Sequence, residues 1–122
     1  MRHIISLKEQ SADDIRGILD MAAKLKKKYK AGEVTDLLPN KTLIMLFQKN
    51  STRTRLSFEA GMTELGGHAI FLAASHAQLP LADFRDEIRA VMRFGDCLMM
   101  RPMRVEDAQT AASFDQIPVI DG

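Results

Sequence analysis

Several features that would direct the chain to a membrane, to secretion or to nucleic acid are missing from the sequence. Cys97 is the one cysteine, so no disulfide can form within the chain. No apolar run approaches the ~20 residues that cross a bilayer, and the start Met-Arg-His-Ile-Ile lacks the apolar core of a secretory signal. The 17 basic and 16 acidic residues leave a net charge of +1, which gives no global field for nucleic acid or anionic lipid. These absences predict a cytoplasmic protein.

The length and composition indicate one ordered domain. The chain has 122 residues, near the usual domain size, and 46% of them are hydrophobic, which can supply a single core. No low-complexity tract or internal repeat is evident. The histidines and the cysteine have no metal-ligand spacing, so no metal is expected.

Four short apolar segments alternate with longer segments and predict a parallel sheet. The expected strands are Thr42 to Phe47, His68 to Leu72, Cys97 to Arg101 and Ile117 to Ile120. Each is mostly apolar on both faces, as buried parallel strands are. Helices are expected at roughly 53–65, 83–94 and 104–113. Right-handed crossovers then give a three-layer α/β/α domain with a four-stranded parallel sheet flanked by helices.

An additional helix is predicted ahead of the sheet. Ser11-Ala12-Asp13-Asp14 resembles a capping box with a shorter acid at its fourth position, and Ala31-Gly32 supplies a stop. Its apolar face comprises Ile15, Ile18, Leu19, Ala22 and Leu25. Five lysines crowd the end of this helix, where cations favour the helix dipole. A solvated helix end explains these lysines more simply than nucleic-acid binding does.

The strongest chemical signal is the segment Ser51-Thr52-Arg53-Thr54-Arg55, which lies between the first predicted strand and a predicted helix. The first N–H groups of a helix have no intrahelical acceptor and the dipole is positive there, so an anion is stabilised. Arg53 and Arg55 offer planar forks that match phosphate oxygens, and the three hydroxyls can donate to the remaining lone pairs. The simpler alternative is one capping hydroxyl followed by solvated arginines. With the flanking strand and helix included, the pattern favours a phosphate site.

The wider segment Phe47-Gln48-Lys49-Asn50-Ser51-Thr52-Arg53-Thr54-Arg55 resembles the carbamoyl phosphate loop of the aspartate/ornithine carbamoyltransferase family. The run Gly61 to Leu72 looks like the family's helix end and second strand, and Met99-Met100-Arg101 like the strand with its second anion-contacting arginine. Ile117 to Gly122 is similar to its fourth strand. The Lys49-Asn50 lead-in and the Leu-Gly-Gly-His-Ala run look more like ornithine than aspartate carbamoyltransferases.

The resemblance implies a role for each of several residues. Ser51, Thr52, Arg53 and Thr54 would hold the phosphate of carbamoyl phosphate. Thr54 and Arg101 would also contact the carbamoyl oxygen, where negative charge grows as an amine attacks. These two are therefore the expected catalytic residues, and the family's chemistry needs no cofactor.

One site residue rests on a partial match. Gln78 lies in Ala74 to Pro80, which resembles the loop that the family extends into the neighbouring subunit's active site. The following residues, 79–85, depart from the family pattern, so only Gln78 is carried over, as a carbamoyl phosphate ligand. The resemblance also implies a homotrimer.

The family continues beyond the point matched by Asp121-Gly122, toward a His-Pro-x-Gln motif and a second domain that binds the amine. We therefore expect residues 1–122 to be the carbamoyl phosphate-binding domain, with half of an active site and little or no turnover alone. Ornithine is the expected amine, bound through the second domain. Alternatives are a carbamoyltransferase for aspartate, putrescine or N-acylornithine, and a non-catalytic trimerising scaffold.

Overall fold

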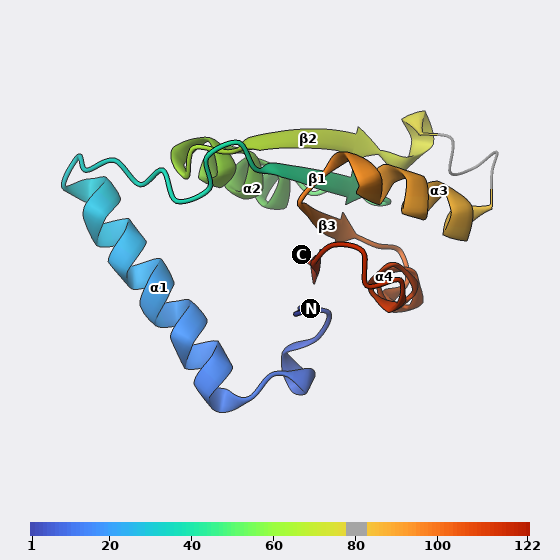
Figure 1. The fold of residues 1–122 in the computed structure, drawn as a ribbon, viewed down its shortest axis with the longest axis horizontal. Coiled ribbons are helices and arrows are strands. Elements are labelled where there is room, and N and C mark those ends of the chain that lie inside the picture. The colour runs from blue at the N-terminus through green and yellow to red at the C-terminus, as the bar shows by residue number, and fades with distance from the viewer. Residues whose placement is uncertain (78–82) are drawn as a thin grey trace.

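A computed structural model describes residues 1–77 and 83–122 (Figure 1). Four parallel strands form one sheet in the order β2-β1-β3-β4. The strands are β1 (Thr42–Phe47), β2 (His68–Ala73), β3 (Cys97–Arg101) and β4 (Val119–Asp121). The α-helices are α1 (Ala12–Lys30), α2 (Thr52–Glu64), α3 (Phe84–Val91) and α4 (Val105–Ser113). Short 3₁₀ turns cover Leu7–Glu9, Ala74–His76 and Met92–Phe94.

The two central strands form the core of the domain. All residues from Leu43 to Phe47 in β1 and from Leu98 to Met100 in β3 are buried. Successive strand side chains point to opposite faces, so these continuous apolar runs require cover on both sides. The edge strand β2 differs from the expectation of a strand buried on both faces, because His68 and Ile70 are exposed.

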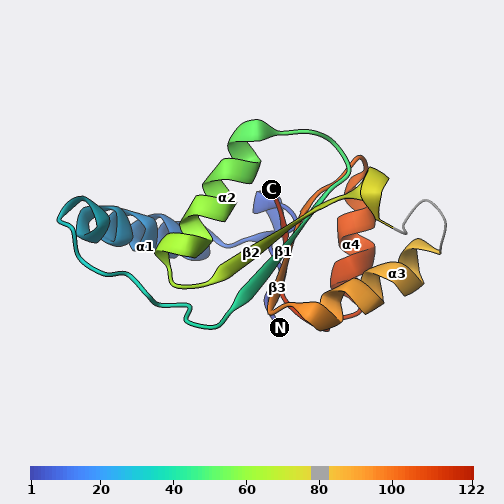
Figure 2. The same ribbon diagram turned by 90° about the horizontal axis from the view of Figure 1, so that it is seen from above.

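Helices cover the two faces of the sheet, as Figure 2 shows with α2 on one side and α3 and α4 on the other. Phe58 and Met62 of α2 pack against one buried cluster, which consists of Leu43, Met45, Phe47 and Met99. The other face contains the buried residues Ile44, Leu46, Ile88, Met92, Leu98, Met100, Ala108, Ala111 and Val119. The predicted three-layer α/β/α architecture with a four-stranded parallel sheet is confirmed.

Helix α1 lies outside these layers. Ser11 caps it as predicted, since the Ser11 hydroxyl accepts from the Asp14 N–H at 3.1 Å and donates to the Asp14 carboxylate at 2.7 Å. Gly32 follows its end with φ +74°, a left-handed conformation that suits glycine. None of its residues is buried, and Figure 1 shows it projecting beside the sheet. Ile18, Leu19 and Ala22 of its apolar face are exposed, whereas Ile15 and Leu25 are half-buried.

The turn between α2 and β2 depends on two glycines. Gly66 has φ +83°, and a Cβ added to Gly67 would lie 2.9 Å from the Lys41 carbonyl oxygen. Larger residues would strain this turn, because it must bring β2 directly beside β1. The turn thus sets the register in which His68 pairs with Thr42.

The predicted element boundaries hold to within three residues. β1 and β3 match the expectation, whereas β2 extends to Ala73 and β4 covers Val119–Asp121. The predicted helix 83–94 is an α-helix only to Val91 and continues as a 3₁₀ turn. The pairing of Ile4 with Ile120 beside β4 is a contact that the sequence pattern did not indicate. Over the described residues, no helix has the length and apolar character needed to cross a membrane.

Candidate anion-binding site

The site is built where two central strands end side by side. Phe47, the last residue of β1, pairs in register with Arg101, the last residue of β3. The chain leaving β1 reaches Ser51, the N-cap of α2, after a three-residue loop. Carboxyl ends of parallel strands are where open α/β sheets bind ligands. The predicted residues Ser51, Thr52, Arg53, Thr54 and Arg101 therefore share one edge of the sheet.

The start of α2 has no side-chain cap. Ser51 has the extended conformation of an N-cap (φ −159°), yet its hydroxyl donates to the Thr54 hydroxyl at 2.8 Å. Its oxygen accepts no first-turn N–H, unlike that of Ser11 in α1. The first N–H groups of α2 thus lack both an intrahelical acceptor and a cap, and the dipole adds positive potential. An anion at this position would satisfy them.

Two residues of the first turn face solvent. Thr52 and Arg53 are exposed, and within residues 1–77 and 83–122 no carboxylate pairs with Arg53. Its guanidinium keeps all of its donors for a ligand. Arg53 is therefore placed like an anion-binding group and unlike a structural one.

One hydrogen-bond donor of Arg101 has no acceptor among the described residues. One terminal nitrogen donates to the Gly122 carbonyl oxygen at 2.8 Å. Its Nε atom is buried and has no partner among the described residues. A buried charged donor without an acceptor is costly, so this nitrogen would be stabilised by any acceptor that a small rearrangement brought to it. The arginine is half-buried and tied to the backbone, which limits its motion.

Two further charged residues contribute to the potential at this edge. Burial raises the pKa of the Asp121 carboxyl, while the charges of Arg101 and Lys49 act in the opposite direction. Asp121 thus faces two cations, but its partial burial limits the hydration of the ionised carboxylate. Sequence reasoning missed both Lys49 and Asp121 as charges of this edge. Position in the sequence could have identified them. Lys49 follows the predicted strand 42–47 and Asp121 follows the predicted strand 117–120, so both lie at the carboxyl edge of the sheet.

Arg55 makes contacts within the domain that Arg53 does not make. Its Nε donates to the Glu59 carboxylate at 2.8 Å, and its guanidinium carbon lies 3.6 Å from the centre of the Phe71 ring. Arg55 is thus engaged within the domain, yet it lines a hollow together with Ser51 and Thr52, so its role as a second fork for phosphate stays a prediction. On a helix, residue 55 points about 200° away from residue 53, so the two arginines cannot share one face.

The other expected ligand, Gln78, lies outside the described residues. Arg104, expected to be an ordinary residue at the start of a helix, is the N-cap of α4. Across the part of the chain with assigned structure, no three His, Cys, Asp or Glu side chains gather in a way that could hold a metal.

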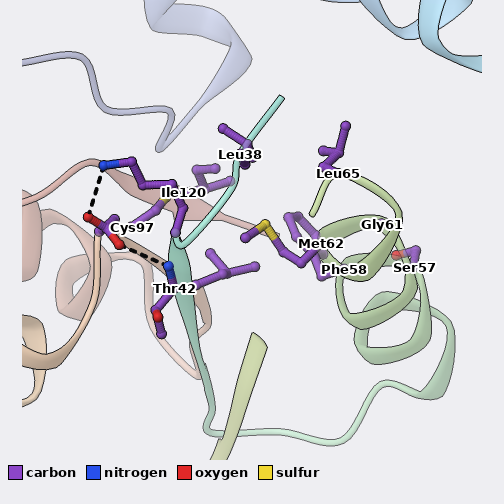
Figure 3. Close-up of a pocket in the computed structure, with 12 residues that line it drawn as sticks. Leu38, Thr42, Ser57, Phe58, Gly61, Met62, Leu65, Cys97 and Ile120 are labelled. Carbon is purple, nitrogen blue, oxygen red and sulfur yellow. Dashed lines mark hydrogen bonds and ion pairs between the residues drawn. The ribbon is translucent and has the colours of Figure 1, made fainter. Parts of the chain in front are cut away.

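A cavity lies at the opposite end of the sheet. It has a volume of about 480 Å³ and is lined largely by apolar side chains. Figure 3 shows Phe58 and Met62 of α2 facing Thr42, Cys97 and Ile120, with Leu38 and Leu65 at the rim. Burial raises the pKa of the Cys97 thiol, so it stays protonated and poorly nucleophilic. With these features, the cavity is not suited to an anion.

Comparison with known proteins identifies relatives of the whole chain. The family described as "Aspartate/ornithine carbamoyltransferase, carbamoyl-P binding domain" matches residues 2–122. An ornithine carbamoyltransferase of Campylobacter curvus is 42% identical over 123 residues, which is 100% of this chain and 40% of that protein. The chain therefore spans about two fifths of the length of this curated relative.

Solved structures agree with the sequence comparison. The ornithine carbamoyltransferase from Pyrococcus furiosus superposes with a TM-score of 0.94 at 40% identity, covering 99% of this chain and 39% of that one. An aspartate transcarbamoylase from Trypanosoma cruzi, solved in complex with carbamoyl phosphate, has a TM-score of 0.89 at 31% identity. That match covers 98% of this chain and 39% of the other.

Proposed function

Because the chain belongs to the aspartate/ornithine carbamoyltransferase family, we propose that residues 1–122 form the carbamoyl phosphate-binding domain of an ornithine carbamoyltransferase. The complete protein would transfer the carbamoyl group to the side-chain amine of ornithine, giving citrulline and phosphate in arginine biosynthesis. A carbon–nitrogen bond forms, the carbon–oxygen bond to phosphate breaks, and the amine loses a proton. We further propose a cytoplasmic homotrimer.

The observation that carries the proposal is that two sets of hydrogen-bond donors without acceptors lie at one edge of the sheet. Helix α2 begins without a cap, and the buried Nε of Arg101 has no acceptor among the residues described. A phosphate dianion would accept from the first N–H groups of α2, and the carbonyl group attached to it would accept from the guanidinium of Arg101. This combination favours carbamoyl phosphate over a simple anion.

Each residue then has a chemical role in the proposal. Ser51, Thr52, Arg53 and Thr54 hold the phosphate through hydroxyls, a guanidinium and the backbone N–H groups of α2. Arg101 and Thr54 donate to the carbamoyl oxygen, which becomes more negative as the amine attacks. Donors fixed before the reaction are each worth roughly 3–4 kcal/mol in such transition states. Gln78 remains a proposed ligand on the strength of the resemblance alone.

The nature of the amine and the assembly are separate parts of the proposal. The relatives named above include enzymes for ornithine and for aspartate, and the anion loop does not itself select the amine. Identity of 42% with an ornithine enzyme supports ornithine. A non-catalytic trimerising scaffold is the alternative, and sedimentation showing a stable trimer that binds no anion would favour it.

Calorimetric titration with carbamoyl phosphate and with inorganic phosphate tests the anion site. We expect saturable binding by the wild-type chain and at least about tenfold weaker binding by Arg53→Ala, since charge-assisted bonds are strong. Arg93→Ala is the matched control, because Arg93 is exposed and precedes β3 at the other end of the sheet. A folded chain that binds neither ligand would contradict the proposal.

The 122-residue chain alone should form no measurable citrulline, because the proposed amine site lies in the remainder of the protein. A colorimetric citrulline assay with ornithine and carbamoyl phosphate measures this directly. Full activity of the isolated chain would show that the amine site is contained in residues 1–122.

A further inference from the structure

Gln48 connects the two halves of the anion site. It directly follows β1, and its backbone N–H donates to the Arg101 carbonyl oxygen at 3.0 Å. Its side-chain oxygen accepts from the Met103 N–H at 3.0 Å, and its side-chain nitrogen donates to the Asp107 carboxylate at 3.0 Å. One residue therefore joins the ends of β1 and β3 and the first turn of α4.

The hydrogen bonds of Gln48 lie between the two parts of the anion site. Gln48 lies three residues before Ser51, and Met103 lies two residues after Arg101. The loop that carries the α2 N-terminus and the loop that follows Arg101 are otherwise separate connections of the sheet. We propose that Gln48 is a positioning residue, which holds Arg101 at a fixed spacing from Ser51–Thr54. This inference rests on the proposed function, because the spacing between Arg101 and Ser51–Thr54 matters only if both bind the same ligand.

The chemistry of the carboxamide explains why this residue type is needed. An amide supplies one acceptor and one donor, and both are used here by Met103 and Asp107. A glutamate would keep the acceptor but place a second carboxylate against Asp107. A methionine of similar size would lose both bonds. Gln48 and Asp107 are both half-buried, so water replaces the lost bonds only in part.

Binding measurements on four variants test the inference. Gln48→Met and Gln48→Glu should each weaken affinity for phosphate and carbamoyl phosphate by about fivefold to tenfold. The double variant Gln48→Glu with Asp107→Asn should recover affinity to within about twofold, because the asparagine amide donates to the new carboxylate. Gln109→Glu adds the same charge to exposed α4 surface and should change affinity by less than about twofold.

Stability must be measured beside affinity, because a merely structural residue would lower stability alone. Thermal unfolding identifies a temperature at which every variant is fully folded, and the titrations are performed there. Unchanged affinity in Gln48→Met would overturn the inference. Equal losses in Gln48→Glu and Gln109→Glu, with none in Gln48→Met, would assign the effect to charge and overturn it as well.

A measurement without ligand separates this inference from the proposed function. In the wild-type chain, the Met103 amide should exchange slowly with solvent and the Arg101 Nε–H group should have a high NMR order parameter. Gln48→Met should speed the exchange and lower the order parameter. If no anion binds the wild-type chain, the proposed function fails. If Arg101 is equally ordered in Gln48→Met, the positioning role fails.

Discussion

Two arginines two positions apart, Arg53 and Arg55, have different environments in the first turn of α2. Arg53 is exposed and keeps its donors, whereas Arg55 pairs with Glu59 and stacks on Phe71. Phe71 in turn packs against Phe47 with ring centres 5.2 Å apart. Arg55 thus connects the helix to the edge strand β2, while the guanidinium of Arg53 is available to an anion.

Substitution of each arginine should separate stability from binding. Arg55→Ala should lower the free energy of unfolding by about 1 kcal/mol, from the lost stacking and ion pair, and leave phosphate affinity within about twofold. Arg53→Ala should change stability by less than about 0.5 kcal/mol and lose binding. Urea unfolding and calorimetry on both variants measure this. The reverse pattern would mean that the two residues exchange roles in solution.

At the scale of elements, the start of β1 is held by a carboxylate from the turn before β3. The Thr42 N–H donates to Asp96 at 2.8 Å, and Lys41 lies 3.5 Å from the same carboxylate. The Thr42 hydrogen bond lowers the pKa of Asp96 below its ordinary value of 3.8; burial opposes this, and the charge of Lys41 adds to it. The contact aligns the amino ends of two neighbouring strands.

This contact should make stability depend on pH. Because the folded-state pKa is lowered, the carboxylate stabilises the fold above pH 3.8, and this contribution is lost as pH falls through the lower folded-state value. Asp96→Asn should therefore melt at a lower temperature than wild type at neutral pH, with the gap closing in acid. Asp20→Asn, on the exposed face of α1, is the control. A gap that widens in acid would contradict the assignment.

Helix α1 and strand β3 should respond differently to the same truncation. Leu98 is fully buried in the sheet, whereas the Leu19 residue of α1 is 63% exposed. Leu98→Ala should cost about 2–5 kcal/mol through lost packing and a cavity, and Leu19→Ala less than about 0.5 kcal/mol. Chemical denaturation of both variants provides the comparison. Equal losses would show that α1 is packed against protein in solution.

At the scale of the whole molecule, the fold places hydrogen-bond donors without acceptors at one edge of the sheet and an apolar cavity at the other. The net charge of +1 gives no general affinity for anions. Binding energy must therefore come from the carboxyl edge alone. Any anion bound there adds to the stability of the entire domain, because the unfolded chain has no such site.

Phosphate should consequently raise the melting temperature of the wild-type chain. At a free concentration of about 100 times Kd, the expected gain is about 2.7 kcal/mol. Scanning calorimetry across a series of phosphate concentrations, at constant ionic strength, measures the effect. Arg53→Ala should need at least about tenfold more phosphate for the same rise, and sodium chloride at equal ionic strength controls for general salt effects. An equal rise in both proteins at every phosphate concentration would indicate salt stabilisation only.

The sequence by itself determined the approximate strands and helices and selected Ser51 to Thr54 as the candidate anion loop. Apolar runs such as Thr42–Phe47 and the cap at Ser11 are local patterns, so they could be predicted without knowing the fold. The same holds for Ser51 to Thr54, whose meaning depends on the strand before them and the helix after them.

Only the tertiary structure decided which residues meet at the site. The strand order β2-β1-β3-β4 places Arg101 beside Phe47, although 54 positions separate them in sequence. It also turned Arg55 toward Phe71, gave Gln48 its bonds to Met103 and Asp107, and left α1 without buried residues. These contacts join segments distant in sequence, and their energies depend on packing that no local pattern contains.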